Sequence, residues 1–144
     1  METRENSFTQ GIRKNKVGQT VQTAFTYWAS YVVWIQGVYY LLMGLWPILS
    51  VSGFEAVTGP KTDVWLVKTI GLLLIVVGFV LIIAAYRRQI RFEMAILGIG
   101  SALALTVIEL VYVTTGVISP VYLLDAFVQI LLVAGWIRRD DSYA

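Results

Sequence analysis

A run of more than twenty mostly apolar residues, within positions 62–88, constrains the fold of this chain more than any other feature. It reads TDVWLVKTIGLLLIVVGFVLIIAAYRR, which opens with a helix-capping pair and stops at two arginines. A helix of about 20 apolar residues spans the ~30 Å hydrocarbon core of a bilayer. The run therefore predicts a membrane-spanning helix, and the lysine inside it, Lys68, needs a partner on another helix.

The composition extends this prediction to the whole chain. Of 144 residues, 58% are hydrophobic and 14% are charged, whereas a soluble domain has about 25% charged residues. Four apolar stretches occupy most of the length and leave no room for a soluble domain. We expect an all-α integral membrane protein, an antiparallel bundle of four transmembrane helices.

The predicted boundaries follow the apolar stretches. The four-helix membrane domain covers 27–137, with helices at 27–49, 63–86, 92–115 and 119–137. A cytoplasmic or interfacial N-terminal segment, 1–26, precedes it, and a cytoplasmic tail, 138–144, follows it. The linker 50–61 is the longest predicted loop. The connection 116–119 is so short that the last two helices must be antiparallel neighbours, with Ser119 as N-cap and Pro120 at the first helical position.

Small residues mark the faces where these helices should pack. Gly71, Gly78 and Ala85 repeat every seven residues along the second predicted helix, and Gly98 and Ala102 lie four apart on the third. Small side chains let two helices approach closely inside a membrane. We expect these faces to serve packing within the bundle, with a homo-oligomer contact as the alternative.

The distribution of basic residues predicts the orientation. Four lysines and arginines precede the first helix, three lie at 87–91 and two follow the last helix, which places nine of eleven on one side. Cytoplasmic loops of membrane proteins carry the excess of lysine and arginine. Both termini should therefore be cytoplasmic, in a prokaryotic inner (cytoplasmic) membrane. A net charge of +2 needs no nucleic-acid partner.

Cysteine and histidine are absent from the sequence. This excludes disulfides, thiolate chemistry and the commonest metal ligand. We therefore expect no cofactor, no metal site and no catalytic residue that the sequence can identify.

Three ionisable residues fall at one depth in the predicted bundle. Lys68, Glu109 and Asp125 each lie five or six residues from the outer end of a helix. At about 1.5 Å per residue they are roughly 7–10 Å below the outer boundary. An ionisable side chain in hydrocarbon costs about 2.5–3.5 kcal/mol on insertion scales. We therefore expect Lys68 to pair with Glu109, Asp125 or both inside the bundle.

This polar centre has a structural and a functional interpretation. In the structural interpretation, it stabilises the packing and order of the helices through hydrogen bonds with neighbouring polar side chains. As a ligand-binding site, it has two carboxylates against one ammonium, so a proton or a bound cation must cancel the excess charge. The candidate binding residues are Lys68, Glu109, Asp125, Gln36, Tyr40, Tyr112 and Gln129.

The leading functional hypothesis is a non-enzymatic binding or accessory protein in the lipid bilayer, with a cationic or amphipathic small molecule as ligand. The first alternative is an oligomeric small transporter or channel subunit for a proton or such a solute. The second is a membrane isomerase-like enzyme that uses Glu109 or Asp125 as acid and base, although no positioned partner group is visible in the sequence.

Two segments, FEAVTGPKTDVWLVKTIG (54–71) and ISPVYLLDAFVQ (118–129), together with four short spans, resemble the small bacterial membrane proteins of the DoxX-like group. The resemblance implies a four-helix membrane architecture. Thiosulfate or quinone oxidation, linked to some members, does not extend to a chain without cysteine. A further similarity, of architecture only, links the chain to the sterol-isomerase and sigma-receptor-like four-helix proteins, which place carboxylates in an aromatic-lined membrane cavity.

Overall fold

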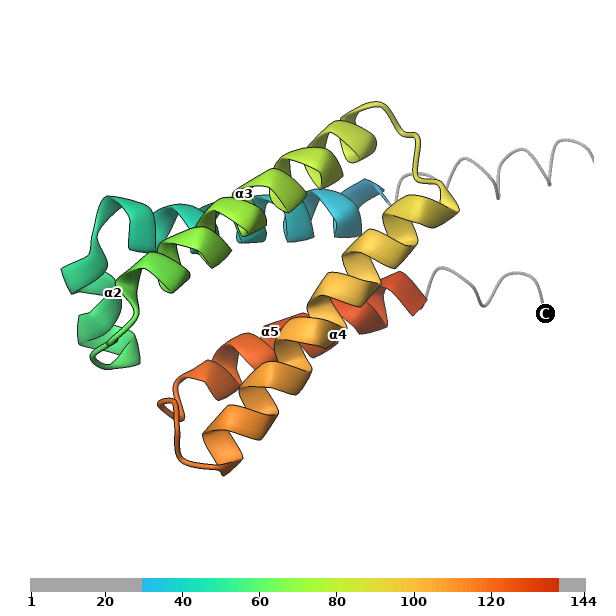
Figure 1. The fold of residues 1–144 in the computed structure, drawn as a ribbon. Helices are drawn as coiled ribbons and strands as arrows, with labels where there is room; N and C mark the ends of the chain where they lie inside the picture. The colour runs from blue at the N-terminus through green and yellow to red at the C-terminus, as the bar shows by residue number, and fades with distance from the viewer. Residues whose placement is uncertain (1–29, 138–144) are drawn as a thin grey trace, which may run out of the picture.

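The structure, a computed structural model, describes residues 30–137. All regular secondary structure in this part of the chain is helical (Figure 1). The five helices are a first helix, Ser30–Leu49, followed by α2 (Val51–Thr58), α3 (Val64–Tyr86), α4 (Phe92–Thr114) and α5 (Tyr122–Ile137). The predicted N-terminal segment 1–26, the first three residues of the helix predicted at 27–49, and the tail 138–144 lie outside the described residues.

The helix boundaries agree with the sequence for α3 and α4 to within a residue. The last helix differs, because α5 begins at Tyr122 and not at Pro120. The N–H of Tyr122 donates to the Ser119 carbonyl at 3.1 Å, and the N–H of Val121 donates to Ser119 Oγ at 3.4 Å. Ser119 therefore caps a tight turn that contains Pro120 and leads into the helix.

The prediction of a loop at 50–61 is wrong for most of that segment, because α2 occupies Val51–Thr58. The Ser50 hydroxyl accepts a hydrogen bond from the N–H of Gly53 at 3.1 Å, which caps the start of the helix. Gly59, at φ 88°, ends it in a conformation that suits glycine. The glycines of this segment therefore end a helix or are accommodated in it, and do not prevent one.

The first helix packs on α3 through glycines. A Cβ built on Gly44 would lie 2.3 Å from the Gly71 carbonyl oxygen, and one on Gly78 would lie 2.7 Å from the Gly37 carbonyl oxygen. The backbones are therefore in direct contact at two levels. Because Gly37 faces Gly78 and Gly44 faces Gly71, the two helices run in opposite directions, side by side in Figure 1. The predicted packing role of Gly71 and Gly78 is confirmed.

The second close pair is α4 with α5. A Cβ on Gly98, near the start of α4, would lie 2.6 Å from the ring of Trp136, near the end of α5, so these helices are also antiparallel. Ala102, one turn after Gly98, is fully buried, which confirms the predicted packing face. The first helix contacts this pair as well, because Gln36 Nε2 donates to the Gly98 carbonyl at 2.8 Å.

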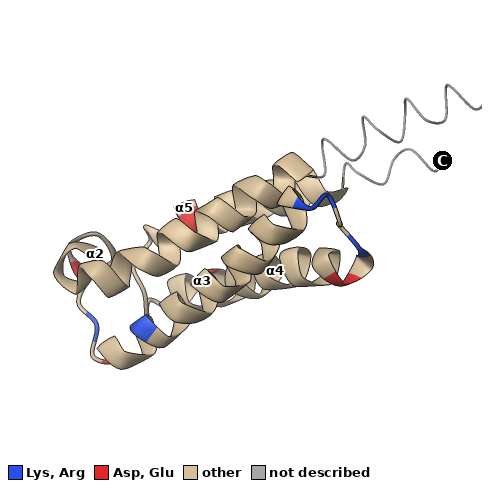
Figure 2. Ribbon diagram, turned by 90° about the horizontal axis from the view of Figure 1, so that it is seen from above, with Lys and Arg blue, Asp and Glu red and all other residues tan. Residues whose placement is uncertain are grey.

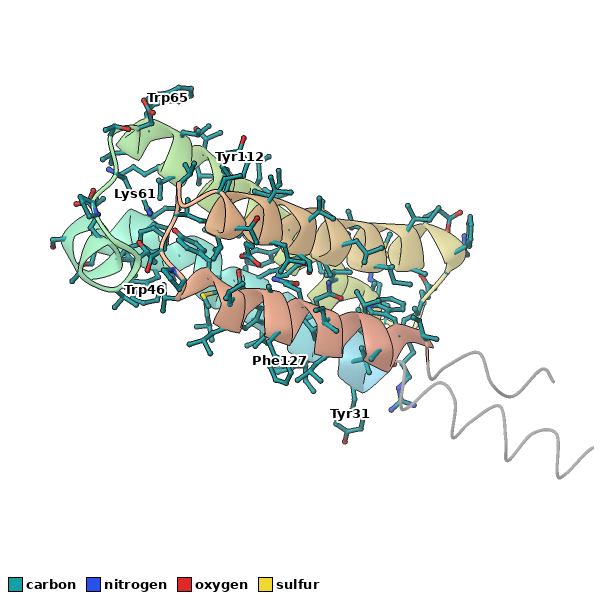
Figure 3. The ribbon with its side chains drawn as sticks, turned by 90° about the horizontal axis from the view of Figure 1, so that it is seen from below. Tyr31, Trp46, Lys61, Trp65, Tyr112 and Phe127 are labelled. Atoms are coloured by element: carbon teal, nitrogen blue, oxygen red, sulfur yellow. The ribbon has the colours of Figure 1, made fainter. Side chains whose placement is uncertain are left out.

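Apolar side chains cover the outside of the molecule. Tyr31, Trp65 and Phe127 point away from the helices (Figure 3), and each is at least 60% exposed. Of the described helices, the first helix, α3 and α4 are long and apolar enough to cross a membrane, whereas α5, also apolar, has 16 residues. Most of the helical ribbon in Figure 2 carries no charge, and basic residues gather at the turn between α3 and α4.

Polar side chains, in contrast, lie inside. Gln36 and Tyr40 of the first helix are fully buried, and so, within a few per cent, are Glu109 of α4 and Gln129 of α5. Glutamate and glutamine are mostly exposed in water-soluble proteins, so their burial here, among apolar side chains such as Leu81 and Trp136, is unusual. The space between the first helix, α4 and α5 is therefore where a polar site can form.

Candidate functional site

The polar interior begins with a hydrogen-bonded group around Gln36. The indole N–H of Trp136 donates to Gln36 Oε1 at 2.7 Å, and Gln36 Nε2 donates to the Tyr40 hydroxyl at 3.2 Å. The same Nε2 also donates to the Gly98 carbonyl. Residues from the first helix, α4 and α5 thus meet at one side chain, with donors and acceptors matched as burial requires.

The network continues along α5 toward Asp125. The Tyr40 hydroxyl donates to Gln129 Oε1 at 3.2 Å, and Gln129 Nε2 donates to Asp125 Oδ1 at 3.3 Å. The Tyr39 hydroxyl donates to the same Asp125 oxygen. Because Asp125 and Gln129 are four residues apart, they share one face of α5 and can present both groups to the first helix.

The network ends in a pair of carboxyl groups. Glu109 of α4 and Asp125 of α5 lie close to each other. Only 5% of the Glu109 surface is exposed, and its Oε2 has no hydrogen-bond partner. No ion pair joins either carboxyl group to a lysine or arginine within 30–137. The site therefore contains two acids and no basic residue of the described chain.

Each carboxyl group is placed by its helix. Glu109 lies on the buried face of α4 that also carries Gly98, Ala102 and Thr106. Asp125 lies in the first turn of α5, where the partial positive charge of the helix N-terminus favours a negative side chain. The packing of Trp136 against Gly98 sets the register of the two helices and so brings the two acids to the same level.

The predicted pairing of Lys68 with these acids is wrong. Lys68 is exposed, and its ammonium forms no ion pair with Glu109 or Asp125. The reason is the rotation of α3, which packs on the first helix through Gly71 and Gly78 and leaves Lys68 beside that contact. Asp125 instead accepts a hydrogen bond from Tyr39 of the first helix. Equal depth along the helix axes was therefore not sufficient to predict contact.

The structure brings together five of the seven predicted site residues, namely Gln36, Tyr40, Glu109, Asp125 and Gln129. Lys68 is outside this group, and so is Tyr112, which is 43% exposed.

Sequence reasoning missed three members of the network: Tyr39, Ser101 and Trp136. Ser101 Oγ lies 3.1 Å from the Tyr40 hydroxyl and also donates to the Leu97 carbonyl. The sequence pattern could have indicated Trp136, because it lies on the same face of the last predicted helix as Asp125 and Gln129. The pattern indicates Tyr39 less strongly: it is three residues after Gln36 and so lies near the same face of the first helix.

Lys61 connects the segment after α2 to the first turn of α5. The Lys61 ammonium donates to the Thr58 carbonyl at 3.1 Å and lies 5.1 Å from the centroid of the Tyr122 ring, a cation–π contact. Tyr122 is one turn before Asp125 on α5. Figure 3 shows Lys61 at the α2 end of the molecule. The contact ties the segment after α2 to the start of α5.

This arrangement suits a proton or a monovalent cation with N–H groups. Within 30–137 no group of three or more candidate metal ligands is present. Two carboxyl groups with one buried oxygen lacking a donor can instead accept a hydrogen bond from an ammonium.

Comparisons with protein-family models, curated proteins and solved structures find no match to the chain. The resemblance to the DoxX-like group stays a prediction.

Proposed function

We propose that the chain is an integral membrane protein that crosses the bilayer as an antiparallel four-helix bundle. Three described helices of sufficient length and the shorter α5 support this, as do the many large apolar side chains that are exposed on the outside. Exposed apolar faces of this extent are stable against lipid tails and unfavourable in water.

The proposed orientation places both termini and the α3–α4 turn on the cytoplasmic side of a prokaryotic inner membrane. The basic residues Arg87, Arg88 and Arg91 at this turn support it. The α2 segment is then external, and Glu109 and Asp125 lie in the outer half of the bilayer, close to the α4–α5 connection.

Labelling of single cysteines tests the orientation, because the natural chain has no cysteine of its own. Ser52→Cys in α2 and Gln89→Cys in the α3–α4 turn are both at exposed positions. In intact cells a membrane-impermeant maleimide should label position 52 at once and position 89 only after permeabilisation. Labelling of position 89 first would reverse the orientation, and equal labelling of both would contradict the membrane-spanning arrangement.

Within the bilayer, we propose a binding or accessory function in which the carboxyl pair receives the cationic group of an amphipathic small molecule. The observation that carries this is the buried Glu109 Oε2, which has no hydrogen-bond partner although it adjoins a second carboxyl group. A buried acceptor without a donor is costly, and an ammonium supplies both the donor and the opposite charge. The aromatic residue Tyr39 lies beside the same pair.

Binding of hexylammonium tests this proposal. With the full chain in phosphatidylcholine nanodiscs, calorimetry should detect hexylammonium binding and no binding of hexanol, which has the same tail without the charge. Glu109→Gln and Asp125→Asn should each weaken binding at least tenfold, because each removes one of the two carboxyl groups that can accept a hydrogen bond from the ammonium.

Lys68→Met and Tyr112→Phe are the matched controls, since both side chains lie outside the network. They should bind as the natural chain does. Binding that survives neutralisation of both Glu109 and Asp125 would contradict the assigned site. Binding lost in Lys68→Met would restore the lysine to it.

A further inference from the structure

Lys68 carries a charge on the outside of the bundle. It is exposed, and within residues 30–137 its ammonium forms no hydrogen bond and no ion pair. The acids of α4 and α5 near this end are not available to it: Glu109 is buried, and Asp125 already accepts two hydrogen bonds. A charge that faces hydrocarbon without a partner is unfavourable. The described chain therefore leaves this ammonium open to a partner from its surroundings.

The level of Lys68 along α3 brings its ammonium to the edge of the apolar span. Lys68 is four residues after Val64, the first residue of α3, which is about 6 Å along the helix axis. Side chains on a helix lean toward its N-terminus. A lysine near a helix end also lays its apolar stem along the helix and places its charge among the polar headgroups. Both effects move the ammonium toward the level of the lipid phosphates.

The face of α3 around Lys68 is polar at one end and apolar along the rest, as a phospholipid is. Trp65 is three residues before Lys68 and Leu72 is four residues after it, so the three share a face, which Phe79 continues. The three apolar side chains are each more than half exposed, and Trp65 points away from the molecule (Figure 3). Tryptophan is enriched at the level of the headgroups. This face therefore offers an indole and an ammonium to a headgroup and apolar side chains to an acyl chain.

Lys61, in the segment before α3, differs from Lys68 in its contacts. Its ammonium donates to the Thr58 carbonyl at 3.1 Å and lies 5.1 Å from the centroid of the Tyr122 ring. Lys61 is therefore engaged within the protein. The two lysines carry the same charge, and only Lys68 has it free for a ligand from outside.

We propose that Lys68 and Trp65 form a binding site for a phospholipid with a negatively charged headgroup. The Lys68 ammonium pairs with the lipid phosphate, and an acyl chain lies along Leu72 and Phe79. Charge complementarity favours this occupant over a second copy of the chain, because the buried Glu109 has no free surface to offer a lysine from outside. The proposal rests on the membrane-spanning arrangement proposed above, and it assigns a ligand to a different surface from the carboxyl pair.

Binding of two lipids that differ only in the headgroup tests this site. The full chain in detergent micelles is titrated with phosphatidylglycerol, which is anionic, or with phosphatidylcholine of the same acyl chains, and bound lipid is counted by native mass spectrometry. Phosphatidylglycerol should bind about fivefold more tightly, the effect of one lysine near an anionic headgroup. Lys68→Met should bring the ratio of the two affinities to about one, whereas Lys68→Arg and the matched control Lys61→Met should keep it.

The outcomes separate the lipid site from the functions proposed above. Equal binding of both lipids by the natural chain, or a preference that persists in Lys68→Met, would overturn the lipid site. Displacement of the lipid by inorganic phosphate would assign the lysine to a free anion, and a dimer lost in Lys68→Met would assign it to a second copy; either result would overturn the proposal.

Failure of the orientation test by cysteine labelling would overturn the membrane arrangement and the lipid site together, whereas the expected labelling with equal lipid binding would overturn the lipid site alone. Glu109→Gln should lose hexylammonium binding and keep the lipid preference, and Lys68→Met should show the reverse. Circular dichroism checks that Lys68→Met folds, which we expect because an apolar side chain replaces a charge that faces lipid.

Discussion

Trp136→Ala is expected to lower the free energy of unfolding by about 3–5 kcal/mol, the cost of truncating a large buried aromatic side chain. Trp136 is 3% exposed, and its ring fills the space over Gly98. The change also removes the donor to Gln36 Oε1. Unfolding in mixed micelles with increasing sodium dodecyl sulfate, followed by circular dichroism, measures the loss.

Two other variants separate the effects of packing and hydrogen bonding. Trp136→Phe keeps most of the ring and removes the indole N–H, so it should cost only the unsatisfied Gln36 oxygen, about 1–3 kcal/mol. Trp65→Ala removes an equally large ring that is 68% exposed and should leave stability nearly unchanged. Equal losses for Trp65→Ala and Trp136→Ala would contradict the packing described here.

Gly44→Ala should destabilise the contact between the first helix and α3 by about 3 kcal/mol, a large effect for one methyl group. The added Cβ would lie 2.3 Å from the Gly71 carbonyl oxygen and 3.0 Å from Ile75 Cγ1. A backbone carbonyl in a helix cannot rotate away, so the two helices must move apart along their whole contact. The same detergent titration measures the change.

Gly100→Ala is the matched control for Gly44→Ala. Gly100 lies within α4, and a Cβ built there meets nothing within 4 Å. Alanine should therefore leave stability unchanged, or raise it by up to about 1 kcal/mol through its higher helix propensity. Should both alanine variants behave alike, the glycine contact between the first helix and α3 would not be the determinant of packing.

The hydrogen-bonded network gives the interior two roles that these experiments distinguish. Trp136, Gln36 and Tyr40 connect three helices and have their hydrogen bonds satisfied, which is what a structural scaffold needs. Glu109 differs, because one of its oxygens is buried without a partner. Stability should therefore depend on the Gln36 end of the network, and ligand binding on the Glu109 end.

Much of the fold was predictable from local sequence. The positions of α3 and α4 follow from apolar runs of more than twenty residues, the length and composition typical of a membrane-spanning helix. The packing faces of Gly71, Gly78 and Gly98 follow from their spacing along a helix. The short α2 was missed because its glycines were interpreted as loop residues, although Ser50 and Gly59 are suitable caps.

The sequence predicted the level of the candidate site along the helix axes, but it did not predict which way each side chain faces around its helix. Counting residues from the helix ends placed Glu109 and Asp125 at one level, and the two do meet. The same count placed Lys68 with them, and there it failed. Position along a helix is set by its sequence, whereas rotation about the axis is set by what the helix packs against.

The sequence by itself therefore determined that the chain is helical, where its long apolar helices lie and that two acids share a level, because these depend on composition and period. Only the tertiary structure decided which side chains meet. The contact of Gly44 with Gly71 leaves Lys68 beside the helix interface, and the contact of Gly98 with Trp136 aligns the acids with Tyr39. These are packing contacts between distant segments, and the run that opens at Thr62 could not reveal them. Its lysine lies outside the polar centre, which consists of two acids and the side chains that hold them.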